Sequence, residues 1–308
     1  MLPAMYLETL ENGHRKPTKG FLRAAALMSR APMPDVLVAL LYRPELGGGP
    51  LLDLAGATMR GPSFWTAAEH ESLALQTARI HRCNYCVDIH TELVTIASRG
   101  AMDPDDVASH RPELRGVIGL LEACHTEGGD VGGALRRTRA VPVPLDAIHH
   151  AMTVHLVWDA VNRLAHAYGF ELQGAQLHLG TRALHLSGYR LPGFLTGHTD
   201  SSGADGDAPF SARIDALRRA PLHAPAHASL DLRTAALAGE PLPEPWSGYA
   251  EKIRRTPSRL GVDDVRRLTA AGASEEEIIE LTTATAIGAA IHIFDDVERE
   301  MTALEAPS

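Results

Sequence analysis

Apolar residues recur along most of the chain at intervals of three and four positions, the spacing of amphipathic α-helices. The longest such segment covers 145–168, following Pro142 and Pro144 and ending before Gly169. Its apolar stripe is formed by Ile148, Met152, His155, Val161 and Leu164. The alternation typical of β-strands does not extend over a useful length anywhere in the sequence. The pattern therefore predicts an all-α fold.

Two consecutive helices are predicted in the segment that follows residue 66. Thr66 and Glu69 have the spacing of a capping box, which opens a helix over 67–80. A second helix is expected from about Asn84 to Arg99, where Gly100 ends it.

A stretch rich in Gly, Ser and Asp, TDSSGADGD at 199–207, predicts a linker between two domains. We expect one domain over 1–190, a linker over 191–210 and a second helical domain over 211–308. The length of 308 residues also fits two domains.

The C-terminal part of the sequence resembles a partial repeat of the first. An offset of 130 residues aligns Ile148 with Ile278 and Leu164 with Phe294. The second copy contains no cysteine, and the same offset sets Arg213 and Ala216 opposite the two cysteines of the C-x-x-C motif at 83–86. We expect a degenerate second repeat that serves as scaffold.

Composition narrows the class of function. The net charge is −9, the pI is about 6.0, and no run of Lys and Arg is present, so nucleic acid and anionic membranes are poor candidates as partners. The first twenty residues do not have the pattern of a signal peptide, and we expect neither a membrane span nor secretion. A cytoplasmic location follows, where three cysteines do not form a structural disulfide framework.

Cys83 and Cys86 are the strongest candidates for chemistry. On an α-helix their Cα atoms would lie roughly 5 Å apart, within the range of a disulfide. Cys83 is expected in the first turn of its helix, where the dipole favours a thiolate by about 0.3–1 kcal/mol. Lowering a thiol pKa by about two units needs roughly 2.7 kcal/mol, so a further group is required. His90, four residues after Cys86 on the same helix face, is the expected helper.

Glu71 is a further candidate with a structural condition attached. In one straight helix it would lie about 28 Å from His90. It can reach the cysteines only if the chain reverses between Ile80 and Cys83, where neither Gly nor Pro marks a turn.

The spacing E-x11-C-x-x-C-x3-H, formed by Glu71, Cys83, Cys86 and His90, resembles that of the AhpD-like alkylhydroperoxidases in the carboxymuconolactone decarboxylase superfamily. The segments 145–169 and 268–296 resemble the helix that follows the motif in that family and a degenerate second copy of it. The resemblance implies an AhpD-like helical bundle that forms homo-oligomers. It also implies a peroxidase cycle in which Cys86 attacks the hydroperoxide. Cys83 would protonate the leaving oxygen and then form a disulfide with Cys86, while Glu71 and His90 act as a proton relay.

The resemblance implies no bound cofactor or metal, because a dithiol partner of the lipoyl or thioredoxin type would supply the electrons. A small hydroperoxide or a disulfide would be the substrate. The sequence departs from the family at Arg82, where Gly is frequent, and at Tyr85, where the founding enzymes have His. These departures make the chain reversal and the completeness of the relay open questions.

Two alternatives remain. One is a metal-binding or hydrolytic protein, in which either the C-x-x-C pair with His90 or the group His149, His150 and His155 holds an ion, with His292 and Asp296 nearby in sequence. The other is a non-redox member of the same superfamily that works in specialised metabolism. Cys124 matches nothing in the motif, and we interpret it as a structural residue.

Overall fold

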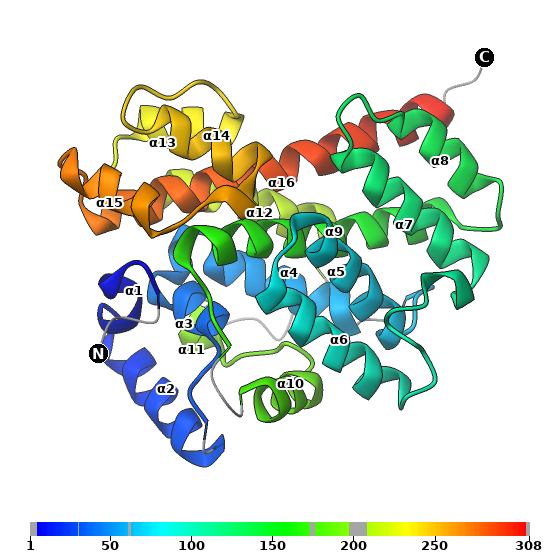
Figure 1. The fold of residues 1–308 in the computed structure, drawn as a ribbon, viewed down its shortest axis with the longest axis horizontal. Coiled ribbons are helices and arrows are strands. Elements are labelled where there is room, and N and C mark those ends of the chain that lie inside the picture. Colours follow the sequence, from blue (N-terminus) through cyan, green and yellow to red (C-terminus); the bar gives the residue numbers. More distant parts are fainter. Residues whose placement is uncertain (1–4, 30, 61–62, 173–175, 197–207, 306–308) are drawn as a thin grey trace.

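The computed structural model describes residues 5–29, 31–60, 63–172, 176–196 and 208–305. Every secondary-structure element in these ranges is a helix, so the all-α prediction is confirmed (Figure 1). The α-helices are α1 Glu8–Asn12, α2 Lys16–Ser29, α3 Asp35–Tyr42, α4 Gly48–Arg60, α5 Ala67–His81, α6 Asn84–Ser98, α7 Pro112–His125, α8 Val131–Arg139, α9 Leu145–Tyr168, α10 Gln176–Ser187, α11 Gly193–Thr196, α12 Phe210–His223, α13 Leu230–Ala238, α14 Ser247–Arg255, α15 Val262–Ala270 and α16 Glu275–Glu305.

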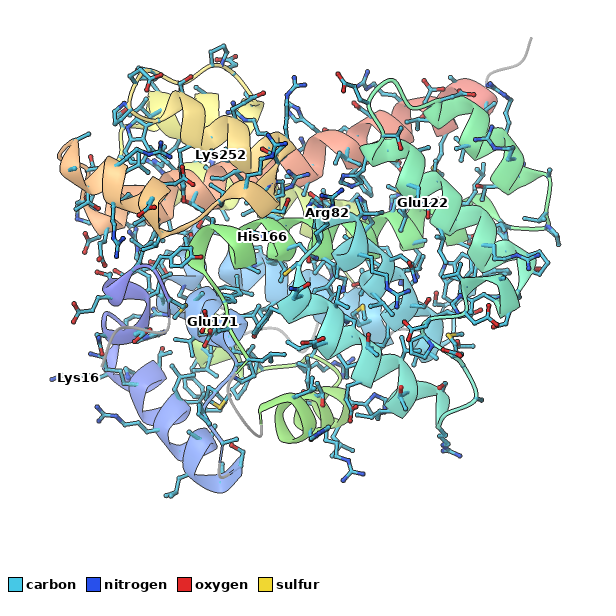
Figure 2. The ribbon with its side chains drawn as sticks, in the orientation of Figure 1. Lys16, Arg82, Glu122, His166, Glu171 and Lys252 are labelled. Atoms are coloured by element: carbon cyan, nitrogen blue, oxygen red, sulfur yellow. The ribbon has the colours of Figure 1, made fainter. Side chains whose placement is uncertain are left out.

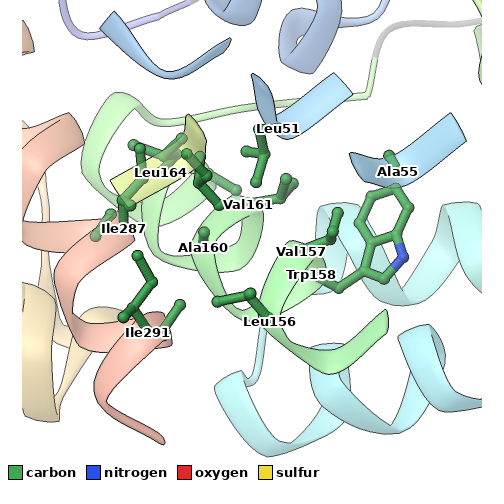
Figure 3. Packing of buried hydrophobic residues seen from close by; sticks show 14 of the residues in the cluster. Leu51, Ala55, Leu156, Val157, Trp158, Ala160, Val161, Leu164, Ile287 and Ile291 are labelled. Atoms are coloured by element: carbon green, nitrogen blue, oxygen red, sulfur yellow. The ribbon is translucent and has the colours of Figure 1, made fainter. Parts of the chain in front are cut away.

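The two longest helices, α9 and α16, pack against each other at the centre of the molecule (Figure 1). Figure 3 shows Ile287 and Ile291 of α16 beside the ribbon of α9, from which Leu164 and Leu156 project. Both helices are buried over most of their length, which removes their apolar side chains from water. The predicted core helix over 145–168 is therefore present with the expected bounds, ending at Gly169 in a left-handed conformation.

Helices α5 and α6 form a hairpin beside α9. The capping box at the start of α5 is present as predicted, with Thr66 and Glu69 each accepting from the other's backbone N–H. Helix α5 ends at His81, and α6 begins only three residues later. This hairpin and α9 carry most of the candidate site.

The second half of the chain repeats some features of the first. Helices α9 and α16 begin 130 positions apart, as the alignment requires, and α8 and α15 begin 131 positions apart. The positions aligned with the cysteines differ in one respect. Cys83 precedes α6 and Cys86 lies in its first turn, whereas Arg213 and Ala216 both lie inside α12, where Arg213 pairs with Asp53 of α4.

The predicted linker core at 199–207 lies entirely outside the described residues, and the described part of 191–210 includes the short helix α11. Helix α16 is long and apolar enough to cross a membrane. However, 78% of its most apolar window is buried in the protein, which fits the core helix of a soluble protein.

Candidate active site

The chain reverses direction at Arg82, which meets the condition set for Glu71. Arg82 has the left-handed backbone conformation, with a φ of 55°. The N–H groups of Arg82 and Cys83 donate to the carbonyls of Arg79 and Ala78, each at 3.0 Å, which is the Schellman arrangement that closes a helix. Figure 2 labels Arg82 at this turn. The reversal lays α6 back along α5 and brings residues 19 positions apart into contact.

Glu71 and His90 are directly hydrogen-bonded, with 3.0 Å between Glu71 Oε2 and His90 Nδ1. Glu71 is completely buried on α5, and two further side chains donate to its carboxylate. Arg60 Nη2 lies 2.8 Å from Oε1, and the Tyr189 hydroxyl lies 2.9 Å from Oε2. Burial alone would raise the pKa of Glu71, but His90 and Arg60 outweigh it and lower the pKa below its usual value. Glu71 is therefore an ionised carboxylate at neutral pH.

The ionised Glu71 fixes the tautomer of His90. A carboxylate can only accept, so His90 Nδ1 must carry the proton and donate it to Glu71. His90 Nε2 is then the ring atom that can exchange a proton with another group. The ring is held from the side by Trp158 of α9, whose centroid lies 4.3 Å away in an edge-to-face arrangement. His90 is therefore oriented as a base.

The two cysteines are free thiols in different environments. Cys83 is the N-cap residue of α6, and Cys86 lies in its first turn. The hydrogen bond from the Cys86 thiol, together with the backbone N–H groups of Cys86 and Tyr85, lowers the pKa of Cys83 against the effect of burial. The same pairing, with burial, raises the pKa of Cys86 well above its ordinary value. The Cys86 thiol thus donates a hydrogen bond to the Cys83 sulfur.

A cavity of about 440 Å³ reaches this group. Of the two cysteines, Cys86 lines it, and so do His90, Trp158 and Tyr189. The other walls are mainly apolar side chains of α3, α4 and α9, including Leu40, Leu51, Leu52, Val157 and Val161. Figure 3 shows the Trp158 indole next to Ala55 of α4, which also lines the cavity. The volume suits a small organic molecule.

Sequence reasoning missed Arg60, Tyr189 and Trp158. Arg60 is 11 residues and Tyr189 118 residues from Glu71, so no local spacing announces either contact. The only nearby sequence signal is the turn residue Gly188, which precedes Tyr189. In the structure both residues have positive φ.

The remaining candidates are placed as follows. Tyr85 lines the cavity, and its hydroxyl accepts from the backbone N–H of Val36 at 3.3 Å, a packing role. The pKa of the Cys124 thiol is raised to about 12, mainly by burial, which fits an inert structural cysteine.

The histidines proposed as a metal group do not converge. His149 contacts Glu298 of α16, and His150 contacts Ser63 and the carbonyl of Thr58. His155 contacts Thr77 and His125. His292 and Asp296 are both exposed on α16.

No protein-family model matches the chain, and no curated protein matches it at significant similarity.

Proposed function

We propose that the chain is a thiol-dependent reductase of organic hydroperoxides, related in its E-x11-C-x-x-C-x3-H motif to the AhpD-like group. The observation that carries the proposal is the state of His90. Glu71 accepts the Nδ1 proton, so Nε2 is the ring atom that can exchange a proton, and His90 lies on the wall of the same cavity that Cys86 lines. A dithiol, an oriented imidazole and an organic-sized cavity together favour peroxide reduction.

The positions of the two cysteines support a division of labour between them. Transfer of the Cys86 proton to His90 Nε2 leaves Cys86 as the thiolate that faces the cavity. Its sulfur attacks one oxygen of ROOH, the O–O bond breaks, and Cys86 becomes a sulfenic acid. The leaving alkoxide takes the stored proton and departs as ROH.

The second step regenerates a closed pair. The Cys83 thiol attacks the Cys86 sulfenic acid and an S–S bond forms, while the departing hydroxide takes the Cys83 proton and leaves as water. The peroxide has then gained two electrons, and the dithiol has lost two. An external dithiol of the lipoyl or thioredoxin type reduces the disulfide by thiol–disulfide exchange and is itself oxidised. A cytoplasmic location and assembly into homo-oligomers belong to the same proposal.

The apolar walls narrow the substrate. A hydroperoxide with a hydrocarbon body gains from burial at about 25 cal/mol per Å² of apolar surface, whereas hydrogen peroxide gains nothing of this kind. The site is therefore expected to prefer cumene hydroperoxide to hydrogen peroxide, by about tenfold or more in kcat/KM for about 1.4 kcal/mol of differential binding.

Titration of thiols before and after cumene hydroperoxide tests the reaction. The three free cysteines should fall by the two of the motif, and Cys86→Ser should abolish both thiol loss and peroxide consumption. Cys83→Ser should stop at a sulfenic acid that dimedone traps. Cys124→Ser is the matched control and should behave as the parent. Equal peroxide consumption by the parent and Cys86→Ser would overturn the proposal and favour a non-redox function of the cavity.

A further inference from the structure

A second cluster of ionisable side chains lies on neighbouring faces of α5 and α9, separate from the dithiol site. It consists of His81 at the end of α5, His125 at the end of α7, and His155 and Asp159 one turn apart on α9. The nitrogen or oxygen atoms of His81, His125 and Asp159 that could bind an ion all lie within 4.8 Å of one another.

Three distances within the cluster are close to those of a small coordination shell, and His155 is joined to the other three residues through His125. His125 Nε2 lies 3.1 Å from His155 Nε2 and 3.4 Å from Asp159 Oδ1. Ligands about 2.0–2.1 Å from a tetrahedral zinc ion are themselves about 3.3 Å apart. The third measured pair, His81 Nε2 and Asp159 Oδ1, is closer at 2.5 Å and would open by less than about 1 Å. We propose that His81, His125, His155 and Asp159 bind one divalent transition-metal ion, zinc by preference, as a structural site that ties α5, α7 and α9 together.

The tautomer of His155 is already set for a metal. The Thr77 hydroxyl donates its only proton to the carbonyl of Leu73 at 2.9 Å, so towards His155 Nδ1, also at 2.9 Å, it can only accept. His155 therefore carries its proton on Nδ1 and directs a free Nε2 lone pair at the centre of the cluster. A fixed proton on the outer nitrogen is the usual support of a metal-bound histidine.

The carboxylate of Asp159 is held in a comparable way. Arg163 holds both oxygens, since its Nε donates to Oδ2 at 2.7 Å and its Nη2 donates to Oδ1 at 3.1 Å. Oδ1 therefore faces both Arg163 and the histidines. Arg163 also donates to the carbonyls of Ile253 and Arg254, at 2.7 and 2.5 Å, so its charge is divided among several acceptors.

Three of the four side chains, those of His81, His155 and Asp159, are buried. Asp159 and His155 are at most 1% exposed, whereas the His125 side chain is 14% exposed, so the ion would enter past His125. Three nitrogens and one oxygen favour zinc over calcium or magnesium, which prefer all-oxygen shells.

The test uses the chain with Cys83→Ser and Cys86→Ser, so that the dithiol cannot bind the ion instead. After incubation with zinc chloride and dialysis, elemental analysis should find about one zinc per chain, and saturating zinc should raise the melting temperature by about 5 °C or more. Cobalt(II) chloride alone should give the visible absorption of a tetrahedral site. The same measurements on His125→Ala, a partly exposed position, and on Asp159→Asn should lose all three signals.

His149→Ala is the matched control, because His149 lies on the same helix α9 but contacts Glu298. It should bind zinc like the parent. Absence of retained zinc and of a thermal shift in the cysteine-free parent would overturn the proposal without any further variant. Unchanged zinc content in a folded His125→Ala, judged by circular dichroism, would overturn it as well. In either case, the four residues form a hydrogen-bonded cluster only.

Discussion

Glu71 and Glu280 are both completely buried, one in each half of the chain, and the groups around them differ in kind. Glu71 accepts from three side chains, two of which, His90 and Tyr189, line the cavity beside Cys86. Glu280 of α16 accepts from Arg43 and from the backbone N–H groups of His227 and Ala228, at 2.6–3.0 Å. Glu280 thus fixes the connection between α12 and α13, where no thiol is present.

The comparison shows that a buried charge alone does not identify an active site. In both carboxyls burial would raise the pKa, and hydrogen bonds from donors reverse the shift. What distinguishes Glu71 is a partner that can itself move a proton and that borders a cavity. Glu280 has one such partner in His227, whose Nδ1 lies 3.2 Å from Oε1, but that ring is exposed and does not line the cavity, so Glu280 holds structure.

Replacing each glutamate by glutamine should separate these roles, with the largest effect of the three predictions. Glu71→Gln frees the tautomer of His90 and should lower kcat/KM for cumene hydroperoxide by about 100-fold or more, per folded molecule. Glu280→Gln should leave kcat/KM unchanged but lower the free energy of unfolding by about 2 kcal/mol, since buried donors lose a charged acceptor. Peroxide consumption and urea denaturation measure the two effects. The same loss of activity in both variants would remove the distinction.

The sequence predicts those parts of the fold that depend on local signals. The capping box of Thr66 and Glu69 sets the start of α5, and Gly169 ends α9, because each signal acts within a few residues. The reversal at Arg82 could not be predicted, since a left-handed residue other than Gly is set by the packing of α5 on α6 and carries no mark in the sequence.

The candidate site divides in the same way. The motif of Glu71, Cys83, Cys86 and His90 names both partners of the central hydrogen bond, Glu71 and His90, which meet once the α5–α6 hairpin forms. The donor Tyr189 comes from beyond α10, and the second cluster draws on three helices, so neither has a spacing that a sequence could reveal. The residues of the motif could therefore be predicted from the sequence, whereas the side chains that tertiary packing brings to them could not.

The two halves should also differ in their response to acid. Within the described ranges all seven histidines that are buried precede residue 170: His14, His70, His81, His90, His110, His150 and His155. Those after the predicted linker, His223, His227 and His292, are exposed. Burial, with His150 nearby, lowers the pKa of His70 to about 4 from the usual value for histidine of about 6.5. The folded state then keeps His70 neutral where the unfolded chain takes a proton.

Because of this lowered pKa, the free energy of unfolding does not depend on the ionisation of His70 above about pH 6.5, and it decreases as the pH falls towards about 4. At pH 5 the loss amounts to about 2 kcal/mol. Urea denaturation at pH 7.5 and pH 5 should therefore show a difference in unfolding free energy that His70→Asn reduces by about 2 kcal/mol. His223→Asn, in the second half, should leave the difference as it is. An unchanged difference in His70→Asn would show that His70 is not kept neutral by the fold.

The smallest effect concerns the turn that creates the site. Helix α13 packs on α16 as α5 packs on α9, and α13 ends in Gly239 with a φ of 75°, where α5 ends in Arg82 with a φ of 55°. A side chain in this conformation costs about 1 kcal/mol, part of which the greater freedom of unfolded Gly offsets. Arg82→Gly should therefore raise the free energy of unfolding by about 0.5–1 kcal/mol in urea denaturation.

Arg99 provides the matched comparison, because it ends α6 with a φ of 54° and, like Arg82, is exposed. Arg99→Gly should stabilise the protein by the same amount if backbone strain is the whole cause. A loss of stability in Arg82→Gly alone would mean that the Arg82 side chain itself holds the hairpin closed. Arg82 would then contribute side-chain contacts to the half with the cysteines. Gly239, which makes the corresponding turn in the second half, has no side chain to do so.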